Sequence, residues 1–268
     1  MAKPIFTITI IIILSSLVSI SAQAYFVTNS CSGKGNYTEN SAYKTNLVNL
    51  FSALVSAASR VRSYKATIES GRERVRAHFY CRRGFKLGAC QSCVRDALSR
   101  VMQQCRNARE AIVWYEECTL SYGPGEWTVK SEMEESIPWA WWYSSHSVEE
   151  ISNRDQFNQT LRNLSEGLTY KATSGNKPTF FAAGEAFVTI LETLYGTVEC
   201  SPSISPYECR KCLKTGWSRA SNCCGEARWA VVFLPSCQVR YDIGPFSPSS
   251  SSGPFSTIET LAAPMITA

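Results

Sequence analysis

Three cysteines in the segment CRRGFKLGACQSC, residues 81–93, have a spacing that could support chemistry. Cys81 is followed after eight residues by Cys90 and after two more by Cys93. A Cys-x2-Cys pair can ligate zinc, cycle between thiol and disulfide, or form part of a structural disulfide clamp. The choice among these depends on the compartment in which the chain folds.

The N-terminal segment predicts that compartment. Lys3 precedes an apolar run from Ile5 to Ile20, and the run ends in the small-residue pattern SAQA. This is typical of a secretory signal peptide, which we expect at residues 1–24. The run is short for a membrane anchor, no basic cluster follows it, and no later segment is apolar enough to span a bilayer. Three acceptor sites for N-glycosylation agree with a secreted, extracellular protein: Asn36, Asn158 and Asn163.

Secretion favours disulfides over the other two chemistries. All 12 cysteines follow the signal peptide, and an even number in an oxidising compartment predicts pairing. A zinc site would require the Cys90-x2-Cys93 and Cys209-x2-Cys212 pairs to meet in space. We therefore expect no metal and no cofactor.

The cysteine motif occurs twice in gap-free register. Five cysteines of the first copy each have a counterpart 119 residues later: Cys81, Cys90, Cys93, Cys105 and Cys118 correspond to Cys200, Cys209, Cys212, Cys224 and Cys237. Upstream, TNLVNLFSAL (45–54) resembles QTLRNLSEGL (159–168). We expect a first domain at 25–125, an acidic linker at 126–150, a second domain at 151–246 and a disordered Ser/Pro-rich tail at 247–268.

Each copy has the pattern of helices and strands in alternation. Apolar residues at helical spacing predict a helix over 47–58 and over 161–168, and a second helix from about 89 to 104. β-Branched and aromatic residues predict strands at 111–115 and 228–234, each followed by another alternating strand. The expected fold is α+β, with two tandem disulfide-clamped domains, each a small antiparallel sheet with two helices packed on it.

These segments resemble a plant family. The spacing Cys-x8-Cys-x2-Cys, followed by IVWYEECTLSY in the first copy and LPSCQVRY in the second, is similar to the ginkbilobin-homologous, or stress-antifungal, domain. Tandem copies form the cysteine-rich repeat secretory proteins and the ectodomains of cysteine-rich receptor-like kinases. The resemblance covers about residues 25–246.

The resemblance implies a disulfide scheme. In the first copy it pairs Cys31 with Cys105, Cys81 with Cys90, and Cys93 with Cys118. In the second it pairs Cys200 with Cys209 and Cys212 with Cys237. No upstream residue matches Cys31 in the second copy, and an additional Cys223 lies beside Cys224. A vicinal Cys223–Cys224 disulfide and two buried free thiols both remain open.

The family implies a secreted, non-enzymatic interaction protein of the plant apoplast, in stress or defence signalling, with an extracellular protein or receptor as partner. An enzyme is not expected, because the two histidines, His78 and His146, belong to no recognisable nucleophile motif. A structural role in the cell wall or at plasmodesmata is a further hypothesis.

The alternative function is a mannose-binding antifungal lectin, the activity of the single-domain family member. Its sugar-binding positions correspond to Ser32, Ile112 and Gly123 in the first copy. In the second copy the last two correspond to Val231 and Asp242, and only Asp242 is chemically similar to the residue of the family. The polar groups that would replace sugar hydration are therefore largely missing.

Basic residues are dense between Arg60 and Lys86. Weak electrostatic binding to acidic cell-wall polysaccharide is one hypothesis, and a solvated loop without a partner is the other. Nucleic acid is not an expected partner of a secreted chain. The residues expected to bind the polysaccharide are Arg72, Arg74, Arg76, Arg82 and Arg83.

Overall fold

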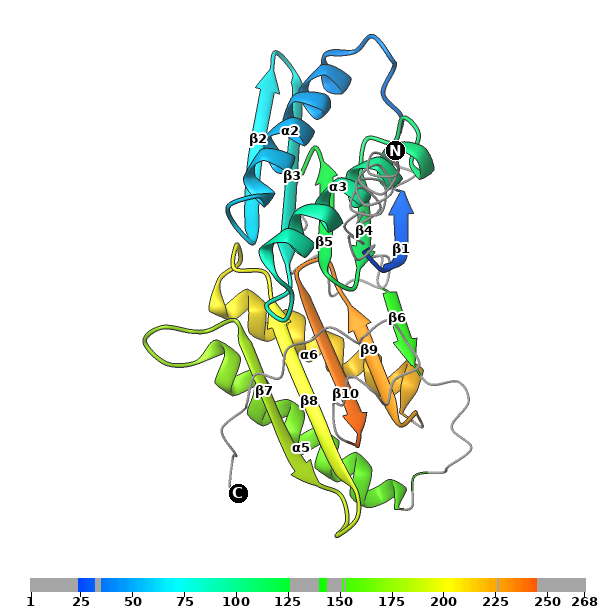
Figure 1. The fold of residues 1–268 in the computed structure, drawn as a ribbon, viewed down its shortest axis with the longest axis vertical. Coiled ribbons are helices and arrows are strands. Elements are labelled where there is room, and N and C mark those ends of the chain that lie inside the picture. Colours follow the sequence, from blue (N-terminus) through cyan, green and yellow to red (C-terminus); the bar gives the residue numbers. More distant parts are fainter. Residues whose placement is uncertain are drawn as a thin grey trace, which may run out of the picture.

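The computed structural model describes residues 24–31, 35–125, 140–143, 151, 153–225 and 227–244. These residues form two α+β domains, one above the other along the long axis of the molecule (Figure 1). Residues 1–23 of the expected signal peptide and the whole of the expected tail lie outside the described residues, as do Ser32 and His146.

The first domain contains two helices and five strands. The helices are α2 (Ala42–Ala58) and α3 (Leu87–Gln104). The strands are β1 (Phe26–Cys31), β2 (Ser63–Ser70), β3 (Glu73–Cys81), β4 (Ala111–Tyr115) and β5 (Cys118–Gly123).

The second domain repeats this arrangement. Its helices are α5 (Arg154–Thr173) and α6 (Pro206–Cys224). Its strands are β6 (Ala140–Tyr143), β7 (Phe181–Phe187), β8 (Thr193–Cys200), β9 (Trp229–Phe233) and β10 (Cys237–Ile243).

The two antiparallel sheets have the same topology. The strand order is β1-β4-β5-β3-β2 in the first and β6-β9-β10-β8-β7 in the second. The α+β duplication predicted from the cysteine spacing is therefore confirmed in both copies. The expected linker at 126–150 needs one correction, because its residues 140–143 form β6 and pair with β9 at the edge of the second sheet.

Local signals explain where three of the helices begin. The Ser41 side chain accepts a hydrogen bond from the Lys44 N–H at the start of α2, and Asn153 accepts one from the Gln156 N–H at the start of α5. A capping box between Ser205 and Glu208, with proline at the first helical position, starts α6.

Each sheet buries one face under its own helices. In the first domain, leucines of α2 pack with Val75, Ala77 and Phe79 of β3. Strand residues alternate between the two faces, so Arg76, His78 and Tyr80 point away from the helices. The helix-free faces of the two sheets meet at the domain junction, with α2 and α3 in front of the first sheet and α5 and α6 behind the second (Figure 1). None of the helices among the described residues has the length and apolar composition needed to cross a bilayer.

Candidate functional site

An apolar cluster lies where the helix-free faces of the two sheets meet. Its buried members are Ile112 and Trp114 of the first domain and Ala140, Val231 and Phe233 of the second. The Trp114 Nε1–H also donates a hydrogen bond to the Leu234 carbonyl oxygen across the junction, at 3.3 Å. Because apolar burial and a satisfied indole N–H act together here, the cluster stabilises the contact between the domains.

This cluster contains two of the positions that the family resemblance implied for sugar binding. Ile112 and Val231 are both 0% exposed. Gly123 contributes no side-chain polar group, while Asp242 is partly buried on β10. Burial raises the pKa of Asp242 to about 6, although Arg240 and Arg228 oppose the shift. The described lectin positions thus do not form a set of converging polar groups.

Arg82 does not belong to an exposed basic surface, so its predicted role in binding polysaccharide is corrected. The side chain is 4% exposed. Its Nη2–H donates to the Thr119 hydroxyl at 2.9 Å, and its Nε–H donates to the Gln238 side-chain oxygen of the second domain. The guanidinium also lies over the Phe233 ring, 5.1 Å from its centroid. Arg82 therefore connects the two domains.

Arg83 is exposed, but it too contacts the second domain. Its backbone N–H donates to the Glu199 carboxylate at 3.0 Å, and its side chain donates to the Thr179 carbonyl oxygen. The guanidinium lies 5.8 Å from the centroid of the Phe181 ring. These contacts hold the loop after β3 against β7 and β8.

The other three predicted arginines lie on the β2–β3 hairpin. Arg72 is exposed at its turn. Arg74 forms a 2.7 Å ion pair with Glu69, and both side chains are about half exposed, so the pair contributes little to stability. The hydrogen bond from Arg74 lowers the pKa of Glu69. Arg76 is half-buried and lines a pocket at the junction.

A buried ion pair also crosses the junction. Glu116, in the β4–β5 turn, lies 3.5 Å from the Arg240 guanidinium on β10. Both side chains are less than a tenth exposed. Burial raises the pKa of Glu116 to about 7, although Arg240 and Arg82 favour the charged form.

The strand register places a row of polar side chains on the helix-free face of the first sheet. Lys65 of β2 lies opposite His78 of β3, which lies opposite Ser121 of β5. Arg76, two residues before His78, lies on the same face. This row forms one wall of the pocket.

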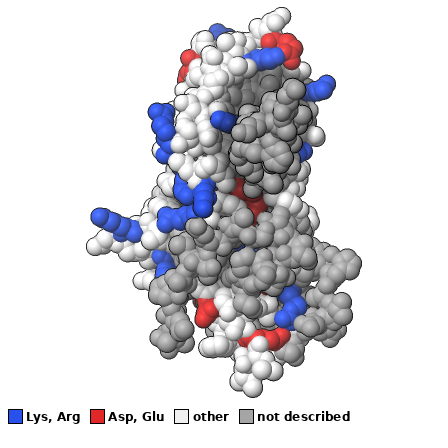
Figure 2. All heavy atoms as spheres, viewed as in Figure 1, with Lys and Arg blue, Asp and Glu red and all other residues white. Residues whose placement is uncertain are grey.

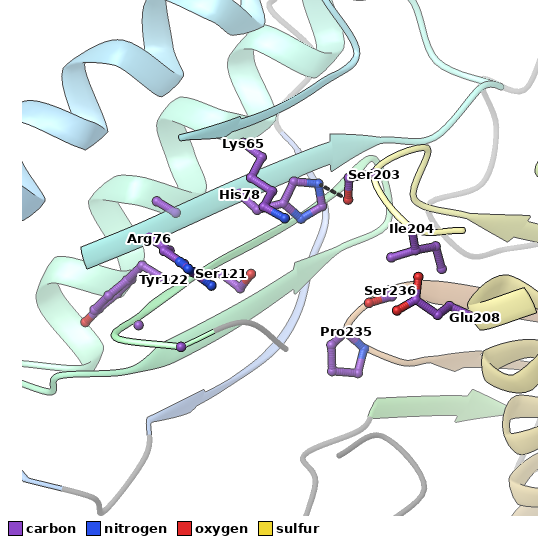
Figure 3. Close-up of a pocket in the computed structure, with 13 residues that line it drawn as sticks. Lys65, Arg76, His78, Ser121, Tyr122, Ser203, Ile204, Glu208, Pro235 and Ser236 are labelled. Carbon is purple, nitrogen blue, oxygen red and sulfur yellow. Dashed lines mark hydrogen bonds between the residues drawn. The ribbon is translucent and has the colours of Figure 1, made fainter. Parts of the chain in front are cut away.

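The second domain forms the facing wall of this pocket, which we call the junction pocket. Figure 3 shows Lys65, Arg76 and His78 on one side and residues of the second domain on the other. The pocket has a volume of about 110 Å³ and is partly open to solvent. Its lining from the second domain is Ser203, Ile204, Glu208, Pro235 and Ser236. Figure 2 shows Lys and Arg side chains gathered on one flank of the molecule, beside the junction.

His78 joins the two walls. Its Nε2 lies 3.4 Å from the Ser63 hydroxyl, 3.2 Å from the Ser201 hydroxyl and 3.3 Å from the Ser203 hydroxyl. The imidazole also stacks on Tyr80, with ring centroids 5.9 Å apart. Since Ser201 and Ser203 belong to the second domain, the imidazole helps to fix the loop after β8.

Six disulfides clamp the described chain. They join Cys31 to Cys105, Cys81 to Cys90, Cys93 to Cys118, Cys200 to Cys209, Cys212 to Cys237, and Cys223 to Cys224. In the structure the last two cysteines are thus a vicinal disulfide at the end of α6. No group of three metal-binding side chains occurs within the part of the chain that the structure describes.

The three predicted glycosylation acceptors have exposed side chains. Asn36 lies before α2, in an isolated bridge with Ala108. Asn158 and Asn163 lie on α5. None of the three is a lining residue of the junction pocket.

Comparison with known proteins identifies the family. A model of the family described as salt stress response/antifungal matches residues 30–124 and 144–243. The chain belongs to this family. The family predicted from the cysteine spacing is therefore confirmed, with both copies recognised.

Two relatives and one solved structure illustrate the likeness. Cysteine-rich repeat secretory protein 1 of Arabidopsis thaliana is 30% identical over 244 residues, which cover 89% of this chain and 69% of that protein. An antimicrobial ginkbilobin-2-like protein of Castanea crenata is 30% identical over 216 residues, covering 81% and 86%. The crystal structure of the tandem DUF26 ectodomain of cysteine-rich receptor-like protein PDLP8 from Arabidopsis thaliana matches with a TM-score of 0.68 at 22% identity. That match covers 83% of this chain and all of the other, and it confirms the tandem fold.

Proposed function

We propose that this protein is a secreted, non-enzymatic interaction protein of the plant apoplast that acts in stress or defence. Its partners would be an extracellular protein or receptor and, more weakly, acidic cell-wall polysaccharide. The six disulfides support a location in an oxidising compartment. The secreted and antimicrobial relatives support a role in stress or defence.

The observation that carries the interaction role is the junction pocket. It combines side chains of both signs with hydroxyl groups, and the two domains each supply one wall. Buried contacts between the domains, from Arg82 to Gln238, from Trp114 to Leu234 and from Glu116 to Arg240, fix the domains relative to each other, so the walls are already in place before a ligand arrives. Preorganised sites lose less conformational entropy on binding.

A protein-capture experiment tests this function. The mature protein would be immobilised through an added C-terminal tag and incubated with apoplastic fluid and solubilised plasma membranes. Bound proteins would be quantified by mass spectrometry against a reduced and alkylated sample, in which the fold is lost. Specific extracellular proteins retained only by the folded sample would support the proposal, and equal recovery on both would contradict it.

The proposal that the protein is not an enzyme can be tested at His78 and the serines that it contacts. Although its imidazole approaches Ser201 and Ser203, it contacts several hydroxyls at once and stacks on Tyr80, which suits a structural link. A fluorophosphonate probe, which labels activated serines, should therefore modify neither Ser201 nor Ser203. Stoichiometric labelling of either residue would favour a hydrolase instead.

The burial of Ile112 and Val231 supports this proposal over the mannose lectin. In both copies this sugar-binding position of the family is thus occupied by a residue of the apolar cluster. A sugar could reach neither position without separating the two domains.

A further inference from the structure

The outer edge of the second sheet has the features of a strand-pairing surface. We propose that β7 pairs with β7 of a second copy of this chain, antiparallel and around a two-fold axis at Gly184. The second sheets of the two copies then continue into each other. The inference goes beyond the proposed function, because it concerns a surface separate from the junction pocket and a different partner.

Four strands form the edges of the two sheets, and β7 has the weakest protection against pairing. The register of β1 is irregular between Phe26 and Thr28, β6 has only four residues, and β2 carries the charged residues Lys65 and Glu69. Bulges, short strands and charges are the features with which proteins commonly protect a sheet edge. In contrast, β7 has the sequence FAAGEAF, with a single charge, and pairs with β8 in unbroken register.

The backbone groups on the outer side of β7 follow from its pairing with β8. The Val188 N–H donates to the Glu192 carbonyl oxygen at 2.9 Å, which fixes the residue pairs that exchange hydrogen bonds. Because such pairs alternate along an antiparallel ladder, the N–H and C=O groups of Ala183, Glu185 and Phe187 point away from β8. No hydrogen bond among the described residues uses these groups. They are a template for a further strand.

The sequence of β7 is self-complementary around Gly184. With the axis at this residue, Phe181 lies opposite Phe187 of the second copy, and Ala183 lies opposite its Glu185. An aromatic pair at each end of the paired strands is favourable, and the two carboxylates do not face each other. An axis at Glu185 would place like charges opposite each other, and an axis at Ala183 would leave Phe187 outside the pairing. The composition of the strand therefore selects one register.

Exposed apolar side chains cluster at the end of this edge. Phe187 is 75% exposed, and Ile190 and Leu191 in the turn after β7 are 98% and 89% exposed. A contiguous apolar patch indicates an interaction surface, whereas single exposed apolar residues do not. In the proposed dimer the Phe187 ring packs beside Phe181 of the second copy. The turn then approaches the loop that contains Arg83 of that copy, because the Arg83 guanidinium lies 5.8 Å from the centroid of the Phe181 ring.

The position of β7 leaves room for both first domains. Figure 1 shows β7 at the outer side of the second sheet, with its turn at the end of the molecule away from the first domain. A two-fold axis across β7 therefore directs the first domains of the two copies towards opposite ends of the dimer. Since the contact is only one strand wide, we expect a weak dimer that dissociates on dilution.

Sedimentation velocity of the full secreted protein over a concentration series tests the proposal. We expect a monomer–dimer equilibrium that Ala183→Glu weakens several-fold, because each new carboxylate faces Glu185 of the other copy. Ala183→Lys, at the same position, should tighten the dimer, because it places opposite charges there. Phe187→Lys should weaken the dimer at least tenfold, since it removes the apolar contact at both ends of the strands. The matched control Tyr207→Lys, which removes a 66% exposed aromatic side chain from α6 of the same domain, should leave the dissociation constant within twofold of the wild type.

Amide exchange followed by NMR locates the contact. The N–H groups of Ala183, Glu185 and Phe187 should exchange rapidly in the dilute monomer and become protected as the dimer forms. A protein that stays monomeric at millimolar concentration would overturn the proposal, as would equal effects of Ala183→Glu and Ala183→Lys, or a dimer that leaves these amides unprotected. Protection that is already present in the dilute monomer, or that appears only with a different protein, would assign the edge to another occupant and contradict the proposal. None of these results depends on the protein-capture experiment, so failure of the dimer and failure of the proposed function are distinguishable.

Discussion

Ile112 and Val231 occupy equivalent positions in the two copies, 119 residues apart, and both are completely buried in the apolar cluster between the domains. Each lies on the helix-free face of its own sheet, the face that would be open to solvent in an isolated domain. The duplication has converted this face into the interior of the molecule. Sugar binding at the lectin position and packing of the two domains therefore exclude each other.

Mannose should consequently not bind to this protein. We expect no saturable chemical-shift change when the mature protein is titrated with mannose to millimolar concentration and followed by NMR. A methyl group of Ile112 or Val231 that shifted with mannose would show that the sugar opens the junction. Saturable shifts elsewhere would show that a lectin site lies outside the family position.

Trp114→Ala should destabilise the whole protein. The substitution removes a buried indole and its hydrogen bond to Leu234, so we expect a loss of about 3–5 kcal/mol in the free energy of unfolding. Guanidinium denaturation, followed by circular dichroism, measures this loss. We also expect one cooperative transition for the wild type, because the junction joins the two cores.

The matched control is Ile190→Ala in the turn between β7 and β8. This side chain is 98% exposed, so its removal should change the free energy of unfolding by less than about 0.5 kcal/mol. If Trp114→Ala lowered the free energy of unfolding no more than Ile190→Ala does, the junction would not hold the domains together.

Stability should increase as the pH falls from about 8 to about 4.5. The pKa of Glu116 is raised from 4.5 to about 7 in the folded protein, mainly by burial. Between these values the folded state binds a proton that the unfolded state does not, so acidification favours folding, and below 4.5 the gain is complete. The shift corresponds to about 3 kcal/mol in all. The raised pKa of Asp242 acts in the same direction.

Urea denaturation at several pH values measures this dependence. Glu116→Gln should reduce the pH dependence, because the amide does not titrate. The slope that remains would come from Asp242 and Glu199, since burial raises their pKa to about 6 and about 7. An unchanged slope in the variant would assign the effect to other carboxyl groups. A wild-type protein that lost stability on acidification from pH 8 to 5 would contradict the prediction.

The disulfides should contribute very unequally to the free energy of unfolding. Cys31 and Cys105 are 74 residues apart, whereas Cys223 and Cys224 are adjacent. On chain-entropy grounds, replacing the first pair with serine should cost about 4 kcal/mol and replacing the vicinal pair about 1 kcal/mol. Denaturation of the two double variants compares them directly. Equal costs would show that the vicinal disulfide acts through packing at the end of α6.

Intact-mass alkylation provides a separate test of the vicinal pair. The described cysteines include no free thiol, so the oxidised protein should take up no alkylating agent before reduction. Uptake of two equivalents at Cys223 and Cys224 would show that the two thiols are free in solution. Stoichiometric zinc would contradict the disulfide clamp altogether.

The sequence predicted those features that depend on local spacing. The cysteine register revealed the duplication, and leucines at helical spacing located α2 and α5. The β2–β3 hairpin was missed, because its many charges suggested a basic loop. The signal was nevertheless present: Arg74, Arg76 and His78 alternate with Val75 and Ala77, which is the period of a strand.

The junction could not be predicted in this way, because its contacts join distant parts of the chain. Arg82 and Gln238 are 156 residues apart, and nothing near Arg82 distinguishes it from the exposed Arg83. The pocket depends on how one sheet is placed over the other. Spacing within either copy contains no information on that placement.

The buried junction also constrains how this sequence can evolve. After a duplication, two copies of a domain can ordinarily accumulate changes separately, each under its own selection. Here a larger or smaller side chain at Ile112 or Trp114 alters the space available to Val231 and Phe233. Compensating substitutions must therefore arise in the opposite copy. A chimera in which one domain is replaced by that of a distant homologue should not form the junction, unless the helix-free face of the other domain is replaced as well.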